Sequence, residues 1–237
     1  MTLVLVVRHG LTAATGTALA GRTPGIALDD RGRAQAAALA QRLAGVRLDA
    51  IVSSPMERCV QTAEAVARAG QGAAVVTDER LTECGYGDWT GKPLRKLARD
   101  PLWRTVQAHP SAVTFPGPGG EAMADIQRRA VAAIRDWNGR LGSGAVYLVC
   151  SHADVIKAIL ADSLGLHLDL YQRIVIDPCS LSVIRYTPTR PFVERLNDVG
   201  GSVAALARAV QSRSEKAPAP AFAPRPGDAP VGGGAGG

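Results

Sequence analysis

Short, mostly apolar runs recur along the first 150 positions of the chain, and each run ends in a polar turn. They occupy residues 3–7, 48–52, 73–77 and 145–150. Continuous apolar runs of this length, rich in β-branched residues, are typical of strands that are buried on both faces, as in a parallel sheet. The pattern therefore predicts four buried strands.

Longer stretches with a helical spacing of apolar residues separate these runs. Asp29 and Asp30 are placed to cap a helix that continues to about residue 43. Ser54 is predicted to be the N-cap, and Pro55 the first residue, of a second helix ending near residue 68. Two more helices are expected from Glu121 and from Asp154. Strands that alternate with helices predict an α/β fold, here a three-layer α/β/α sandwich with a mostly parallel central sheet.

The remaining segments interrupt this alternation. Residues 173–177 and 180–186 alternate in polarity as strands, and with residues 192–196 they predict an antiparallel end to the sheet. Five prolines divide residues 88–120 into short pieces, and we expect this insertion to form a lid over the site. A single catalytic domain is expected over residues 1–212. Residues 213–237, rich in Pro, Ala and Gly, are expected to be a disordered tail.

Composition narrows the class of protein. The formal net charge is +6, but the chain has no run of Lys or Arg and only 4% aromatic residues, which argues against nucleic-acid binding and favours a small anionic partner. No apolar run is long enough for a membrane span, and no signal peptide is predicted. The four cysteines lack the spacing of a metal site, so we expect reduced thiols in a cytoplasmic protein. A homodimer is left open.

Ionisable side chains follow all four predicted buried strands. Arg8 and His9 follow the first, Arg58 lies in the helix after the second, Glu83 follows the third and His152 the fourth. Because the carboxyl ends of parallel strands meet at one edge of a sheet, we expect these side chains to share one crevice. Two arginines and a helix N-terminus favour an anion. Two histidines and a carboxyl group supply a nucleophile, a charge stabiliser and a proton donor.

The motifs around these residues occur in a fixed order. They are Arg-His-Gly-Leu-Thr at 8–12, Ser-Ser-Pro-x-x-Arg-x-x-Gln-Thr-Ala-Glu at 53–64, Leu-x-Glu-x-x-Tyr-Gly-x-Trp-x-Gly at 81–91, Pro-Gly-Gly-Glu at 118–121 and Ser-His at 151–152. Together they resemble the motifs of the histidine phosphatase superfamily, in its phosphoglycerate-mutase-like branch, over roughly residues 1–187. Four of the five, all except Pro-Gly-Gly-Glu, follow predicted strands in the family's order, which makes this resemblance highly specific.

The resemblance implies a role for each residue. His9 would attack phosphorus and become a transient phosphohistidine, while Arg8, Arg58 and His152 would bind the phosphate oxygens. Glu83 would protonate the leaving group, which requires a pKa above its usual value of about 4.3. A backbone carbonyl that accepts from His9 Nδ1–H would present Nε2 to phosphorus. No metal or other cofactor is expected, because the arginines would supply the positive charge.

The sequence also departs from the family pattern. Leu11 stands where many members have Glu, Thr15 where an Asn often contacts the phosphate, and Ala153 where Gly is common. Thr15 and Gly21, in the loop after the first strand, are further candidate phosphate-binding residues. These changes leave the catalytic groups in place and obscure the substrate.

Each of these residues could also have an ordinary structural or surface role, and other functions remain open. Should Glu83 not be the acid, Asp78, Glu79 and Asp88 are the nearby candidates. His109 and His167 lack a strand-end context and are interpreted as structural or surface residues. A metal-independent phosphatase acting on a small phosphorylated metabolite is favoured. A phosphomutase using the same site is the first alternative, although the insertion is short for that class. A non-catalytic phosphate-binding protein is the second, although His9 and Glu83 are both present.

Overall fold

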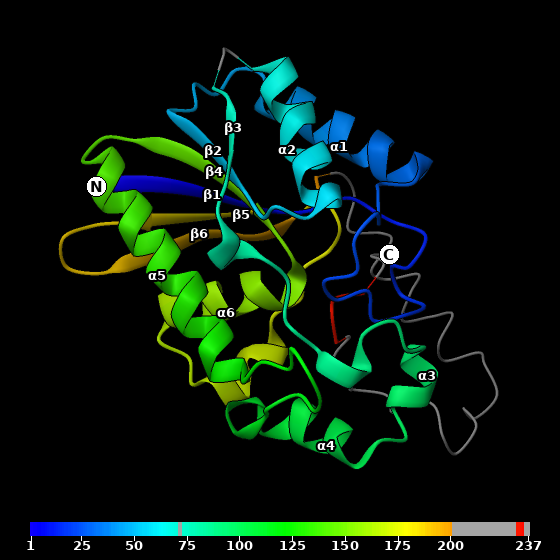
Figure 1. Cartoon of the computed structure of the whole chain (residues 1–237). Coiled ribbons are helices and arrows are strands. Elements are labelled where there is room, and N and C mark those ends of the chain that lie inside the picture. The colour runs from blue at the N-terminus through cyan, green and yellow to red at the C-terminus, as the bar shows by residue number, and fades with distance from the viewer. Residues whose placement is uncertain (71–72, 201–230, 235–237) are drawn as a thin grey trace, which may run out of the picture.

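A six-stranded sheet forms the centre of the computed structural model, which describes residues 1–70, 73–200 and 231–234 (Figure 1). The strand order is β3-β2-β4-β1-β5-β6. The first four strands in this order are parallel to one another. β5 runs antiparallel to β1, and β6 runs antiparallel to β5. The strands are β1 (Thr2–Arg8), β2 (Ala50–Ser53), β3 (Val75–Thr77), β4 (Val146–Ser151), β5 (Leu181–Tyr186) and β6 (Pro191–Asp198).

Helices cover both faces of this sheet, which gives the three layers expected from the sequence (Figure 1). Alternate residues of β1 enter opposite cores: Val4 and Val6 join one apolar cluster, whereas Leu5 and Val7 join the other. The second cluster also contains residues of α1 (Asp30–Leu43) and α2 (Glu57–Ala69). The first contains residues of α5 (Met123–Leu141) and α6 (Ala153–Leu164). The predicted strands β1, β2 and β4 are thus buried on both sides. The prediction of a buried strand was wrong for β3, because β3 lies at the edge of the sheet and its Val76 is 46% exposed.

The helix starts differ in one informative way from the prediction. Asp29 caps α1 as expected, its side chain accepting from Gly32 N at 2.7 Å. The N-cap of α2, however, is Met56 rather than Ser54, and no side chain caps it. The Ser54 hydroxyl instead lies 2.8 Å from His152 Nε2, and its contact with Met56 N is longer, at 3.3 Å. A residue suited to a cap is used to hold a histidine of the neighbouring strand end.

The antiparallel end of the sheet is confirmed, but with fewer strands than predicted. β5 and β6 cover the predicted strands 180–186 and 192–196, whereas residues 174–177 are extended without belonging to any strand. Ile174 and Ile176 are buried and Val175 is half exposed, so the alternation is real. The prediction of a strand was wrong because the segment lies outside the strand ladders; the carbonyl of Ile176 binds Arg8 instead.

Residues 88–120 form short helices that pack against the rest of the domain. They include α3 (Leu94–Leu97) and α4 (Pro101–Ala108). The 3-10 helices among the described residues are Glu79–Leu81, Gly87–Trp89, Pro110–Ala112 and Leu168–Arg173. Trp89 and Trp103 stack with their ring centroids 6.2 Å apart. Ala18 forms a β-bridge with Pro93, so the insertion is joined to the loop that follows β1. The lid role of this insertion stays a prediction.

The C-terminal part of the chain is described only in part. The predicted domain limit at residue 212 and most of the predicted disordered tail lie outside the described residues. The four described tail residues, 231–234, are packed against Arg8 and Asp154, which their composition did not indicate. Among the described residues, none of the helices has the length and apolar character needed to cross a bilayer.

Candidate active site

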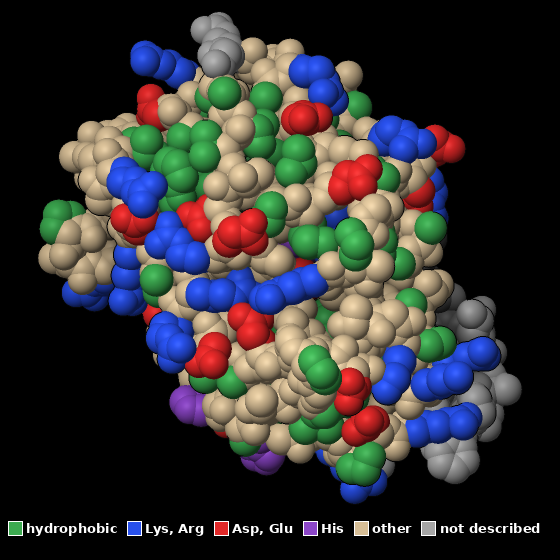
Figure 2. Space-filling model, in the orientation of Figure 1, with side chains coloured by type: hydrophobic (Ala, Val, Ile, Leu, Met, Phe, Trp, Pro, Cys, Tyr) green, Lys and Arg blue, Asp and Glu red, His purple; other side chains and the backbone are tan. Residues whose placement is uncertain are grey.

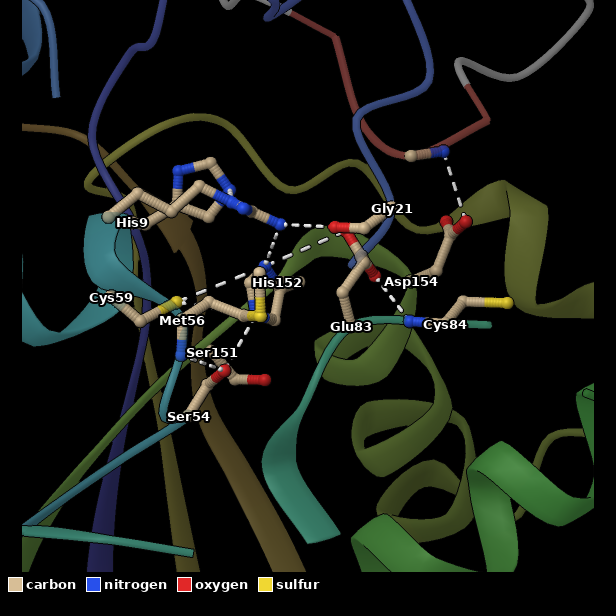
Figure 3. A network of polar contacts seen from close by, with 12 residues as sticks. His9, Gly21, Ser54, Met56, Cys59, Glu83, Cys84, Ser151, His152 and Asp154 are labelled. Atoms are coloured by element: carbon tan, nitrogen blue, oxygen red, sulfur yellow. Dashed lines mark hydrogen bonds and ion pairs between the residues drawn. The ribbon is translucent and has the colours of Figure 1, made fainter. Parts of the chain in front are cut away.

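The five principal candidate residues converge at the carboxyl edge of the parallel strands, as expected. Each side chain is almost fully buried, with exposed fractions between 0% and 5%, for Arg8, His9, Arg58, Glu83 and His152. Figure 3 shows His9, Glu83 and His152 close together above the ends of the strands. The convergence follows from the sheet register, because Arg8 of β1 pairs with Ser151 of β4 and the two histidines come next in the chain.

His9 is held as a neutral imidazole with one defined tautomer. Its Nδ1 lies 2.7 Å from the carbonyl of Gly10, and because a carbonyl can only accept, Nδ1 carries the proton. The lone pair of Nε2 therefore remains available, and Arg58 Nε donates to it at 3.3 Å. Burial lowers the pKa of His9 well below its usual value, and the neighbouring charges of Arg58 and Arg8 lower it further. The ring is an uncharged nucleophile near neutral pH.

Arg58 links the two histidines to the loop that follows β1. Its Nη2 donates to the carbonyl of Gly21 at 2.8 Å and contacts His152 Nδ1 at 3.2 Å. Thr62, one turn along α2, donates its hydroxyl proton to the Arg58 carbonyl and accepts from Gly10 N at 3.1 Å. The second motif therefore holds the backbone of the first, and Arg58 lies in the first turn of its helix as predicted.

His152 is fixed from both sides of its ring. Its Nε2 contacts the Ser54 hydroxyl, and its Nδ1 lies 3.6 Å from Glu83 Oε2. Its ring centroid is 5.2 Å from that of His9, with the planes 62° apart. Burial is the main reason why its pKa falls well below the ordinary range, with the charge of Arg58 next.

Two guanidinium N–H groups are buried without a hydrogen-bond partner among the described residues. They are Arg8 Nε and Arg58 Nη1. Leaving a buried charged donor unpaired is costly, so such donors normally serve a partner that binds reversibly. Both belong to residues expected to bind phosphate. The chemistry of the two donors suits an anion with several oxygens.

Glu83 has the electrostatic setting of a proton donor. Desolvation by burial, followed by the charge of Asp154, raises its pKa from 4.5 to about 7, against the opposing charge of Arg58. Its Oε1 accepts from Cys84 N at 2.9 Å, which orients the carboxyl group. The fallback candidates are engaged elsewhere: Asp78 binds Arg80 and Trp137, and Glu79 contacts Thr82. Of these acids, only Glu83 lines the cleft.

The two further candidates, Thr15 and Gly21, both line the cleft but do different things. The Thr15 hydroxyl is 2.9 Å from the Thr12 hydroxyl and accepts from Thr12 N at 3.0 Å. Gly21 orients Arg58 through its carbonyl, with a positive φ of 54° that favours glycine. The structure thus places Gly21 as a support for Arg58, and Thr15 beside Thr12 in the same loop.

Sequence reasoning missed a cluster that fixes the backbone of Glu83. Arg22 Nε and Arg129 Nη2 donate to the Glu83 carbonyl at 2.8 and 3.2 Å. Both arginines also bind Glu121, whose Oε2 accepts from Gly85 N at 2.9 Å. The sequence marks Glu121 only as part of a loop motif and as the start of a predicted helix. Arg22 and Arg129 carry no local pattern that distinguishes them from ordinary surface arginines.

The other two histidines lie outside this cluster, and the four cysteines are buried. His109 and His167 are largely exposed beside Asp169, in keeping with their interpretation as surface residues. All four cysteines are buried free thiols; Cys59 Sγ lies 3.4 Å from His152 Nε2. Within the described ranges, no group of three or more potential ligands is arranged to hold a metal ion.

A small cleft opens beside the converging residues. One side is the loop after β1, another is Leu94 of the insertion, and the floor is Arg8, His9 and Arg58. The described tail residues 231–233 also line it. A buried neutral imidazole, a buried carboxyl group and two buried guanidinium groups beside one cleft are the groups that a site for phosphoryl transfer needs.

Comparisons with known proteins agree with this class. The profile of the histidine phosphatase superfamily (branch 1) matches residues 4–199. The chain is 30% identical over 204 residues to phosphoserine phosphatase 1 of Hydrogenobacter thermophilus, covering 83% of this chain and 92% of that protein. It is 33% identical over 189 residues to a probable phosphoglycerate mutase of Yersinia enterocolitica, covering 78% and 86%. The solved structure of YhfR from Bacillus stearothermophilus superimposes with a TM-score of 0.74 at 28% identity, covering 84% and 98%.

The chain belongs to the histidine phosphatase superfamily. The resemblance drawn from its motifs is therefore confirmed, and so is the three-layer fold with antiparallel C-terminal strands. The names of its relatives support a phosphatase as the enzyme class.

Proposed function

We propose that this protein is a metal-independent phosphatase that hydrolyses a small phosphomonoester through a phosphohistidine on His9. The observation that carries the proposal is the state of His9: a neutral ring whose proton is held on Nδ1 by Gly10, with Nε2 beside the buried guanidinium group of Arg58 at 3.3 Å. That arrangement supplies a nucleophile and a binding site for the charge of the transferring group at the same place.

In the first step, His9 Nε2 forms a bond to phosphorus while the bond from phosphorus to the leaving oxygen breaks. Glu83, protonated, gives its proton to that oxygen. Arg8, Arg58 and His152 bind the remaining phosphate oxygens, and Gly10 keeps the proton on Nδ1 of the phosphorylated ring. Positioning and electrostatic stabilisation account for most of the rate in phosphoryl transfer, so the fixed arginines matter most.

In the second step, water attacks phosphorus and gives a proton to the Glu83 carboxylate, and the bond between phosphorus and Nε2 breaks. Inorganic phosphate leaves, and His9 and Glu83 regain their starting protonation. A pKa of about 7 lets Glu83 act as an acid and then as a base near neutral pH.

A phosphomutase is the second candidate, because one relative is named a probable phosphoglycerate mutase. It would use the same first step but return the phosphoryl group to an organic hydroxyl instead of water. The phosphatase is favoured because the insertion, with its short helices α3 and α4, is small for a segment that must exclude water from the intermediate.

The test is a comparison of the intact protein with His9→Ala. Incubation with an aryl phosphate, followed by mass spectrometry under alkaline conditions, is expected to show one phosphoryl group on His9 and released phosphate. His9→Ala should lose both, whereas His167→Ala, a change at an exposed histidine, should keep both. Phosphate release by His9→Ala at the intact rate would reject the nucleophile. A coupled assay with phosphoglycerates that shows transfer faster than hydrolysis would favour the mutase.

A further inference from the structure

Residues 231–234, named here the C-terminal segment, lie in the catalytic cleft although they are separated from β6 by more than 30 positions of sequence. Val231 is 1% exposed and belongs to the same apolar cluster as Leu19 and Tyr86. The segment, red in Figure 1, runs beside the loop that follows β1 and passes near Asp154 in Figure 3. It is thus anchored by a buried side chain at its first described residue.

Polar contacts join the segment to Asp154 and to Arg8. Gly232 N donates to Asp154 Oδ2 at 3.0 Å, the same oxygen that accepts from the Tyr86 hydroxyl at 2.8 Å. Two residues later, the Gly234 carbonyl accepts from Arg8 Nη1 at 2.6 Å. Asp154 is itself buried, 3.5 Å from the Lys157 ammonium, so this anchor is firm. The segment bridges a buried carboxylate and a catalytic arginine.

Only glycine fits at the two central positions of the segment. At Gly233, with a φ of 81°, an added Cβ would lie 2.4 Å from the Ala153 Cβ and 2.7 Å from Arg8 Cζ. At Gly232, with a φ of 73°, it would lie 2.7 Å from Leu19 Cδ1. Glycine is the residue that permits both a left-handed backbone and a close approach to other groups. The glycines are therefore required by this docked position.

The segment shares Arg8 with a phosphate rather than replacing it. Arg8 Nη1 carries two hydrogens, and these are donated to the carbonyls of Ile176 and Gly234. The Nε–H of Arg8 makes no such bond and remains for a phosphate oxygen. Two backbone carbonyls on one nitrogen hold the guanidinium plane in a single orientation, which suits a planar fork that binds an anion.

We propose that the C-terminal segment is a wall of the substrate pocket, which orients Arg8 and limits the size of the leaving group. The inference rests on the proposed phosphatase function. A phosphate bound by Arg8, Arg58 and His9 must place its ester group in the cleft that the segment lines together with Thr15 and Leu94. The wall consists of backbone and one valine, so it selects by size and excludes bulky leaving groups.

The experiment removes the wall and measures selectivity. The full chain, a chain ending at Pro230, and Gly233→Ala are compared on phenyl phosphate and 1-naphthyl phosphate. These leaving groups have similar acidity, so the Glu83 proton affects both alike. We expect the ratio of kcat/KM for the naphthyl over the phenyl ester to rise about tenfold or more in both variants, the scale of discrimination by a size-selective pocket. Gly139→Ala, on the open face of α5, should leave the ratio unchanged.

The other outcomes are distinct. An unchanged ratio in variants that remain folded and active would overturn the wall. If the unchanged ratio comes with an equal rise in kcat/KM for both esters and with tighter inhibition by inorganic phosphate, the segment is instead a plug that competes with phosphate. Calorimetry with phenylphosphonate and 1-naphthylphosphonate measures the naphthyl-to-phenyl ratio of binding affinity, without any chemical step. A protein that binds these phosphonates with the expected shift but hydrolyses no ester would refute the proposed function and not the wall.

Discussion

Replacement of Glu83 by Gln separates its role as a proton donor from every other contribution of the site. Gln keeps the size of the side chain and can still accept from Cys84 N, but it cannot donate a proton to an alkoxide. General acid catalysis contributes about 10²- to 10⁴-fold. We expect kcat/KM for an alkyl phosphate to fall by that factor, and kcat/KM for an aryl phosphate to change little, because a phenolate leaves without a proton.

The pH profile adds a second, independent signature. With a pKa of about 7, the Glu83 carboxyl is about nine tenths protonated at pH 6 and about one tenth at pH 8. The rate constant kcat/KM of the intact protein for the alkyl ester should therefore fall about tenfold for each pH unit above about 7. The same plot for Glu83→Gln should lack this descending limb. Glu79→Gln, at an exposed carboxylate nearby, is the matched control.

The raised pKa also has a consequence for stability, with a defined sign. Burial favours the neutral carboxyl in the folded state, so stability is lost as pH rises from about 4.5 through about 7. At 1.36 kcal/mol per pKa unit, the loss is roughly 3 kcal/mol. Glu83→Gln removes it, so urea unfolding should show the variant gaining roughly that amount over the intact protein between pH 4.5 and pH 8.

Two results would refute this reasoning. If the alkyl and aryl esters lose kcat/KM equally in Glu83→Gln, the proton comes from another group and Glu83 only shapes the site. If the difference in unfolding free energy does not vary with pH, Glu83 is not a buried carboxyl with a raised pKa. The value of kcat for the aryl ester tests a different step, because in the proposed mechanism Glu83 also accepts a proton from the water of the second step. If that step becomes slow in Glu83→Gln, the phosphohistidine should accumulate.

Two further predictions concern the support of His152 and the absence of a metal requirement. Ser54→Ala should lower the free energy of unfolding by about 1–3 kcal/mol, because His152 Nε2 loses its partner, and should lower kcat. Ser163→Ala removes another buried serine hydroxyl, bound to Ile159, and should cost stability without lowering kcat; equal kcat in both variants would contradict a role for Ser54 in orienting His152. Phosphate release should persist in excess chelator, measured after dialysis against it, and activity that returns only with an added divalent ion would contradict the metal-independent mechanism.

The sequence predicted the parts of the site that depend on local pattern and sheet topology. Four apolar runs located the parallel strands, and the rule that ligands bind beyond their carboxyl ends placed Arg8, Arg58 and His152 together. The tautomer of His9 was predicted from its required chemistry, and the Gly10 carbonyl provides it. These features are predictable because each is fixed by a few adjacent residues and one topological rule.

The features that could not be predicted depend on contacts between distant segments. Ser54 reads locally as a helix cap, yet a histidine 98 positions away takes its hydroxyl. Residues 174–177 have a strand pattern, but whether a strand forms depends on a neighbour with free backbone groups. The glycines at 232 and 233 read as disorder because composition cannot show that Arg8, Ala153 and Asp154 accommodate a bare backbone.

The register between β1 and β4 fixes the spacing of His9 and His152. Val7 pairs with Cys150 and Arg8 with Ser151, and His9 N donates to the Ser151 carbonyl at 3.1 Å, so the two histidines are spaced by the sheet ladder itself. Changing the spacing would require slipping the central strands, which would turn every buried side chain of β1 to the wrong face. The insertion and the C-terminal segment add no backbone pairing to that ladder, and the segment reaches it only through the Arg8 side chain. Mutation can therefore remodel the insertion while the spacing of the two histidines is inherited unchanged.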